Sequence, residues 1–254
     1  MKVAIIGGTG LGDIQGVDWF DSHRPETPFG QPSAQVRMGR VPSSDLVFYF
    51  LPRHGGDHSI APHKINYRAN IAALKSLGIT HIFAVNAVGG LSDSMGPQAI
   101  VVPDQIIDYT AGRETSFFDG VAGPLDHVDF TEPYDAAARE ALLCAAKDLK
   151  LGCVDGGVYG ATQGPRLETA AEVRRCQKDG CDLVGMTGMP EAVLARELGI
   201  AYASLCLVVN WGAGMTAAPI TLDDIHRVVR LGMTDVQAIL LQALSQLGYV
   251  KAAD

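Results

Sequence analysis

Short apolar runs alternate along the chain with longer segments in which apolar and polar residues recur at helical spacing. The short runs are rich in β-branched side chains, a pattern typical of strands that are buried on both faces. They are VAII (3–6), LVFYFL (46–51), HIFAVN (81–86), AIVV (99–102), DLVGM (182–186) and AYASLCLVVN (201–210). The helical segments lie at about 63–77, 134–149, 168–178 and 189–199. The sequence TLDD predicts a last helix, with Thr221 as its N-cap and Asp224 three residues later.

Buried strands that alternate with helices predict a single α/β domain over residues 1–254, with a central mixed, largely parallel β-sheet flanked by helices. No linker-like stretch, internal repeat or low-complexity tract divides the chain. In such sheets, ligands bind where strands end and loops begin. The segments of interest are therefore those that follow the strands: 7–12, 52–58, 86–91, 187–191 and 210–214.

Composition narrows the range of partners. The formal net charge of −8 disfavours a nucleic-acid or anionic-membrane surface, so any bound anion must be held by a few local groups. The five cysteines form no Cys-x-x-Cys pair and are odd in number, as is typical of reduced thiols. No apolar run reaches the ~20 residues of a membrane span, and the apolar start is too short for a secretory signal. We therefore expect a cytoplasmic protein.

The first apolar run ends in the glycine-rich stretch VAIIGGTGLGD, which is able to present backbone N–H groups to a phosphate. The dinucleotide fingerprint Gly-x-Gly-x-x-Gly fits at Gly8 and Gly10 but fails at Asp13, and the residues that follow lack helical periodicity. Without a helix N-terminus behind the loop, a pyrophosphate has no dipole to hold it. A nicotinamide or flavin cofactor is thus disfavoured. Two interpretations stay open: a structural turn, or a small-anion site to which Thr9 adds a hydroxyl.

Three further segments favour the anion. Arg53 and His54 directly follow an apolar strand, and a guanidinium beside an imidazole can donate to several phosphate oxygens. NAVGGL (86–91) is expected to form a second glycine turn, and MTGMPE (186–191) a third, with a helix that begins near Pro190. Taken singly, each segment is equally compatible with an ordinary surface loop. Together they predict a pocket for one phosphate, formed by Thr9, Arg53, His54, Asn86, Ala87 and Thr187.

Several potential metal ligands lie close together in the sequence, namely His54, Asp57, His58 and His63. Their spacing matches neither His-x-His-x-Asp-His nor His-Glu-x-x-His, the patterns of metal-dependent hydrolases. No metal is expected.

Six blocks, in order from Val3 to about Gly248, resemble the trimeric purine nucleoside phosphorylases and, more closely, their methylthioadenosine phosphorylase branch. They are IIGGTGL, RHG followed by H, NYRAN (66–70), NAVGGL, QGPRLETAAE (163–172) and GMTGMPE (185–191). The resemblance implies a nucleoside phosphorylase fold and phosphorolysis, in which inorganic phosphate attacks C1′ of a purine nucleoside and releases the base. Phosphate is then a co-substrate, and no cofactor is implied. An oxocarbenium-like transition state needs such an oriented anion and a leaving base relieved of its charge.

The same resemblance assigns roles to individual residues. It places phosphate contacts at Thr9, Arg53, His54, Ala87 and Thr187. Asn86 replaces a threonine of the closer branch, so its contact is expected through the backbone. Met186 corresponds to the residue beneath the ribose. His127 corresponds to a histidine that reaches the neighbouring subunit's site near the sugar 5′ end, which implies a homotrimer.

The base-facing positions are Glu168 and Asn210. A 6-oxopurine offers N1–H as a donor and O6 and N7 as acceptors; a carboxylate accepts from N1–H, and an amide donates to O6 or N7 as charge builds there. Asn210, with His54 at the phosphate, is the expected catalytic residue. Adenine-specific relatives carry Ser and Asp at these positions and a further Asp at the position of Gly212. The site therefore favours a 6-oxopurine, although Leu167 replaces an aromatic residue that stacks on the base.

Alternatives remain for the base-facing residues and for the 5′ end. Glu168 can be a helix-start carboxylate and Asn210 a strand-end amide. Leu222 and Ile225 lie three apart on the last helix and either pack it or form an apolar 5′ pocket. An apolar pocket favours S-methyl-5′-thioinosine over inosine. Inosine/guanosine phosphorylase and methylthioadenosine phosphorylase are the alternatives within the class, and a non-catalytic purine-binding module is the alternative outside it.

Overall fold

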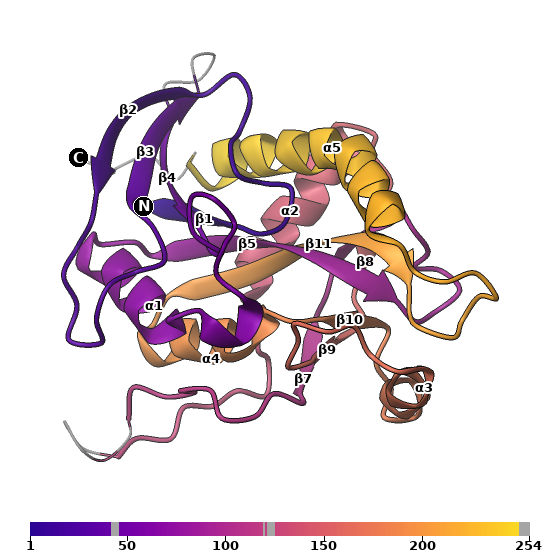
Figure 1. The fold of residues 1–254 in the computed structure, drawn as a ribbon. Helices are drawn as coiled ribbons and strands as arrows, with labels where there is room; N and C mark the ends of the chain where they lie inside the picture. Colours follow the sequence, from indigo (N-terminus) through magenta and orange to yellow (C-terminus); the bar gives the residue numbers. More distant parts are fainter. Residues whose placement is uncertain (42–45, 119, 121–124, 249–254) are drawn as a thin grey trace.

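Successive residues of the central strands pack into different hydrophobic layers. In β1 (Val3–Gly7), Val3 and Ile5 join the cluster formed with α2 (Ala136–Asp148) and α5 (Leu222–Gly248). Ala4 and Ile6 join the opposite cluster, formed with α1 (Tyr67–Ser76) and α4 (Gly188–Glu197). The computed structural model describes residues 1–41, 46–118, 120 and 125–248. Two helices cover each face of the sheet, which explains why its strands are continuously apolar (Figure 1).

Eleven strands form the sheet, in the order β2-β3-β4-β1-β5-β10-β9-β7, with β11 on the other edge of β5, followed by β6 and β8. Parallel pairs join β1 to β4 and β5, and β5 to β11, whereas β2–β3, β3–β4, β5–β10 and β6–β11 are antiparallel. The prediction of a mixed, largely parallel sheet is confirmed. The remaining bounds are β2 (Asp18–His23), β3 (Val36–Val41), β4 (Leu46–Pro52), η1 (Pro62–Lys64), β5 (His81–Gly90), β6 (Ile100–Val102), β7 (Gln105–Asp108), β8 (Val154–Asp155), β9 (Val158–Ala161), α3 (Ala170–Lys178), β10 (Leu183–Gly185) and β11 (Ala201–Trp211).

The expected helices are present, and Thr221 caps α5 by accepting from the Asp224 N–H at 3.1 Å. The expected glycine turn at 86–91 is wrong, because β5 continues to Gly90 and pairs with β11 and β10 along this stretch. Five strands were not expected, namely β2, β3, β7, β8 and β9; β2, for example, is largely exposed and lacks an apolar run. Within the described part of the chain, no helix combines the length and apolarity needed to cross a membrane.

One edge of β5 is left open, and this opening positions the candidate site. Strand β1 pairs with β5 as far as Ile6 opposite Ala84, and β10 takes over only at Gly89. Between these points the described residues place no strand on this edge. Arg53 fills the gap, where its Nη1 donates to the Val85 carbonyl oxygen at 2.8 Å. Gly8 lies so close that a Cβ there would be 2.5 Å from the same oxygen, so this position requires glycine.

Candidate active site

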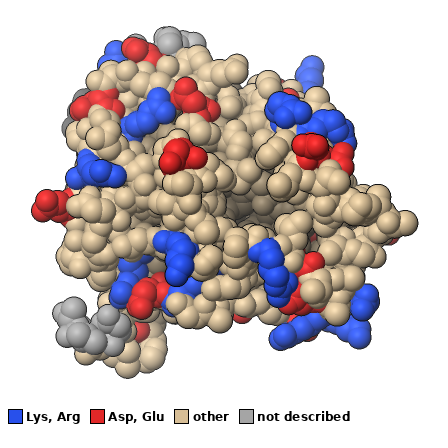
Figure 2. Space-filling model, viewed as in Figure 1, with Lys and Arg blue, Asp and Glu red and all other residues tan. Residues whose placement is uncertain are grey.

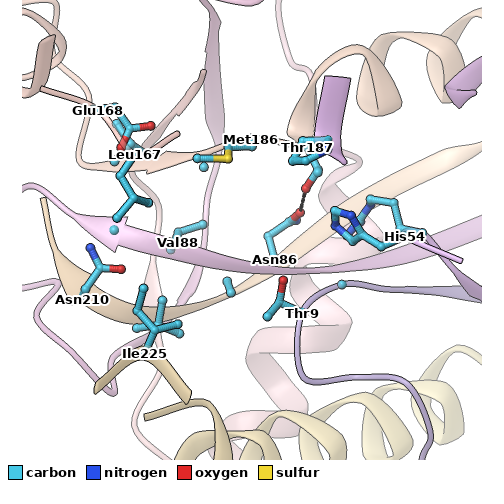
Figure 3. A pocket seen from close by; sticks show the side chains of 18 residues that line it. Thr9, His54, Asn86, Val88, Leu167, Glu168, Met186, Thr187, Asn210 and Ile225 are labelled. Carbon is cyan, nitrogen blue, oxygen red and sulfur yellow. Dashed lines mark hydrogen bonds between the residues drawn. The ribbon is translucent and has the colours of Figure 1, made fainter. Parts of the chain in front are cut away.

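A cavity of about 160 Å³ lies at this opening, where the carboxyl ends of several strands meet (Figure 3). Its labelled residues form two groups, with Thr9, His54, Asn86 and Thr187 at one end and Leu167, Glu168 and Asn210 at the other. We call these the phosphate end and the base end. On the molecular surface, the face seen in Figure 1 is hollowed near its centre, and charged side chains surround the hollow (Figure 2). The predicted residues that line the cavity are Thr9, Arg53, His54, Asn86, Ala87, Leu167, Glu168, Met186, Thr187, Asn210 and Ile225.

Arg53 and Glu191 form a fully buried ion pair at the phosphate end. Arg53 Nε and Nη2 donate to the two carboxylate oxygens of Glu191, each at 2.7 Å, and both side chains are 0% exposed. The Tyr202 hydroxyl donates to the same carboxylate at 2.9 Å. Burial opposes the charged form of Arg53, but the adjacent Glu191 raises its pKa above the usual value. Three of its five N–H groups donate to described residues, so the guanidinium is held rigidly at the wall of the cavity.

His54 is neutral and faces the cavity from the β4 side. Its Nδ1 donates to the Ile60 carbonyl oxygen at 2.8 Å, which leaves Nε2 as an acceptor. Burial and the charge of Arg53 lower the pKa of His54 to about 4. Its ring lies 4.4 Å from that of His58, whose Nε2 is 3.4 Å from Thr9 Oγ1. An anion in the cavity would favour protonation of His54, and Nε2 would then become a donor.

Three buried side chains form a hydrogen-bonded row beside the ion pair. Thr187 Oγ1 donates to Asn86 Oδ1 at 2.8 Å, and Asn86 Nδ2 donates to Ser204 Oγ at 2.7 Å. The Asn86 side chain is thus engaged within the protein, as it would be if only its backbone met the phosphate. Ser204 connects this row to β11.

The base end is built from loop and strand-end residues. Glu168, in the loop before α3, accepts from Thr162 Oγ1 at 2.5 Å. Asn210 Nδ2 donates to the Trp211 carbonyl oxygen at 2.8 Å, so one amide proton remains for a ligand. The β11–β5 pairing skips Val209 and places Asn210 opposite Gly89. This β-bulge lets both Val209 and Asn210 line the cavity.

Three predicted substrate residues lie outside the cavity of their own chain. Gly212 is one of them and packs against Leu91, whose Cδ2 would lie 2.4 Å from a Cβ at this position. Leu222, the first residue of α5, is 69% exposed. His127 is exposed on the connection between β7 and α2. The described residues include no group of three or more His, Cys, Asp or Glu able to hold a metal ion.

Sequence reasoning missed Glu191, Ser204, Thr162 and Arg113. Arg113 anchors the β7–α2 connection to the site, because it donates to the carbonyl oxygens of Met186, Met189 and Gln163 at 2.7–2.8 Å. Glu191 had a weak signal as a carboxylate directly after Pro190. Its partner lies 138 residues away, so only the fold reveals the pair.

Comparison with known proteins identifies relatives over nearly the whole chain. A model of the phosphorylase superfamily matches residues 2–245. A probable S-methyl-5′-thioinosine phosphorylase of Xanthomonas campestris is 50% identical over 226 residues, which cover 89% of this chain and 90% of the relative. The 6-oxopurine nucleoside phosphorylase of Pyrococcus furiosus is 42% identical over 251 residues, with 96% and 92% covered.

The fold is also similar to that of a solved structure. Methylthioadenosine phosphorylase from Schistosoma mansoni, in complex with adenine, superposes with a TM-score of 0.92 at 35% sequence identity. The match covers 100% of this chain and 93% of that one.

Proposed function

The chain belongs to the phosphorylase superfamily and is an enzyme of the purine nucleoside phosphorylase class, and we propose that its preferred substrate is S-methyl-5′-thioinosine. Inorganic phosphate is the co-substrate. Its oxygen forms a bond to C1′ as the bond from C1′ to the base breaks, giving hypoxanthine and 5-methylthioribose-1-phosphate. The names of the relatives from Xanthomonas campestris and Pyrococcus furiosus agree with a 6-oxopurine substrate.

One observation carries the proposal: a single cavity has a cationic, donor-rich end and, opposite it, a carboxylate beside an amide. At the phosphate end, Arg53, His54, Thr9, Thr187 and the backbone of 86–87 orient the attacking anion. This arrangement lowers the barrier by holding the nucleophile near C1′.

At the base end, Glu168 accepts from N1–H and the free Asn210 amide proton reaches O6 or N7. Asn210 thereby stabilises the negative charge that develops on the leaving base. Met186 lies between the two ends in Figure 3, where it would pack beneath the ribose.

The 5′ end of the substrate would meet Ile225, which lines the cavity. An apolar partner suits a methylthio group better than a hydroxyl, whose desolvation would go uncompensated. We further propose a cytoplasmic homotrimer in which His127 reaches the neighbouring site and covers its Leu222. The exposure of both residues in one chain supports this arrangement.

Phosphorolysis of four nucleosides in parallel tests the proposal. We expect methylthioinosine to exceed inosine, methylthioadenosine and adenosine, and base release to require phosphate. Inosine as the better substrate would overturn the apolar 5′ pocket but leave the base site intact. Methylthioadenosine as the better substrate would overturn the roles of Glu168 and Asn210. Purine binding without phosphate-dependent cleavage would refute catalysis altogether.

A further inference from the structure

The Glu168 carboxylate accepts a hydrogen bond from Thr162, and we propose that Thr162 determines base specificity. In this role Thr162 keeps the Glu168 carboxylate oriented as an acceptor for N1–H, and so disfavours 6-aminopurines, whose N1 is itself an acceptor. The inference rests on the proposed function and names a residue that acts on the base through Glu168.

The geometry assigns the hydroxyl proton of Thr162. Its Oγ1 lies 2.5 Å from Glu168 Oε1 and 3.3 Å from the Gly185 carbonyl oxygen. A hydroxyl has one proton, and a carboxylate at the shorter distance is the stronger acceptor. Thr162 therefore donates to Glu168 and leaves Oε2 for the base.

Thr162 is fixed by the sheet, whereas Glu168 is carried by a loop. Thr162 directly follows β9, and its N–H donates to Gly185 O at 2.7 Å, extending the β9–β10 ladder by one residue. Glu168 precedes α3 and follows Leu167, which is 41% exposed. The hydrogen bond thus ties a loop carboxylate to a rigid strand end.

A second cavity beside Glu168 explains why the hydrogen bond from Thr162 matters. About 260 Å³ in volume, it lies on the other side of Glu168 and is lined also by Thr162, Arg166 and Glu172. Glu168 borders both cavities. Without the Thr162 hydroxyl, its carboxylate has room to turn away from the base and into this second cavity, where Arg166 pairs with Glu172. Thr162 therefore determines which of the two cavities the Glu168 carboxylate faces.

Two substitutions at this position separate the hydroxyl from the side-chain shape. Thr162→Val preserves shape and removes the donor, whereas Thr162→Ser keeps the donor. We expect Thr162→Val to lower kcat/KM for methylthioinosine by about tenfold, the effect of one hydrogen bond to a charged group. The loss should lie mainly in the nucleoside KM, with the phosphate KM unchanged, and the activity ratio of methylthioadenosine to methylthioinosine should rise. Thr162→Ser should stay within about twofold of the wild type.

A double-mutant cycle with Glu168→Gln completes the test, because Thr162→Val should have little further effect once the carboxylate is gone. An unchanged substrate ratio in Thr162→Val, or equal damage in Thr162→Ser, would overturn the role of Thr162. Assays of the wild-type enzyme distinguish failure of the proposed function from failure of the proposed role of Thr162. Absence of phosphate-dependent cleavage of methylthioinosine refutes the proposed function and this inference with it, whereas cleavage with an unchanged ratio refutes only this inference.

Discussion

The two ends of the cavity are built in opposite ways. At the phosphate end, buried polar side chains bond to one another across long stretches of sequence, as Arg53 does with Glu191 and Asn86 with Ser204. At the base end, Leu167 is 41% exposed and Glu168 depends on a hydrogen bond from Thr162. In the proposed function, the residues that hold the phosphate common to every substrate are thus embedded in the core. The residues proposed to distinguish one base from another lie on loops and strand ends, where substitutions cost little stability.

The buried ion pair illustrates why the phosphate end is constrained. Removing two charges from water costs on the order of several kcal/mol per ion, and their mutual attraction rarely yields a net gain in stability. A pair of apolar residues would serve the core as well. The buried Arg53–Glu191 pair is consistent with the proposed role of Arg53, a fixed cation beside the attacking anion.

Breaking the ion pair should have the largest effect. Arg53→Met leaves the Glu191 carboxylate buried and unpaired, so we expect the free energy of unfolding to fall by about 3–5 kcal/mol and phosphorolysis to be lost. The double variant Arg53→Met with Glu191→Gln should regain most of the stability, measured by urea unfolding, but none of the activity. Recovery of activity in the double variant would show that Arg53 does not hold phosphate.

A substitution at the base end should change activity with little change in stability. Asn210→Asp replaces the amide donor by a carboxylate, and we expect kcat/KM for 6-oxopurine nucleosides to fall about 100-fold, the usual effect of losing one transition-state donor. The relative activity on 6-aminopurine nucleosides should rise, because a carboxylate can accept from the N6 amino group. Kinetics on methylthioinosine and methylthioadenosine give the ratio, and an unchanged ratio would mean that Asn210 does not contact the base.

The neutrality of His54 predicts a pH-dependent contribution to stability. Its pKa is about 4 in the folded protein and about 6.5 when unfolded, so the unfolded state binds the extra proton between these values. Stability from this group is complete above pH 6.5 and is lost as the pH falls toward 4, by about 2 kcal/mol at pH 5. Urea unfolding at pH 7 and pH 5 should show a smaller decline for His54→Gln than for the wild type. His226→Gln, at an exposed position on α5, is the matched control and should leave the decline unchanged.

The smallest effect is expected from filling the open side of the base end. Leu167→Phe adds an aromatic face where the present side chain is partly exposed, and we expect the nucleoside KM to fall about threefold, in keeping with a single aromatic contact. The phosphate KM should not move, because Leu167 lies at the other end of the cavity. An equal change in both constants would contradict the separation of the two ends.

Much of the fold and several site residues could be predicted because their signals are local. The continuous apolar run from Val3 to Ile6 predicted a strand buried on both faces, and the Thr221–Asp224 spacing predicted a helix start. Arg53 was noticeable because a charge directly after an apolar strand needs a reason. By contrast, glycines 89 and 90 were assigned to a turn, although two neighbouring strands hold them in β5.

The sequence by itself determined the class of fold, the order of its main buried strands and helices and the kinds of chemical group available, because side-chain periodicity and capping act over a few residues. Only the tertiary structure decided which groups meet: the Arg53–Glu191 pair, the opening between β1 and β10, the bulge that directs Asn210, and the packing of Gly212 against Leu91. The reason is physical. These arrangements depend on strand register and on contacts between residues up to 138 positions apart, which no local pattern specifies.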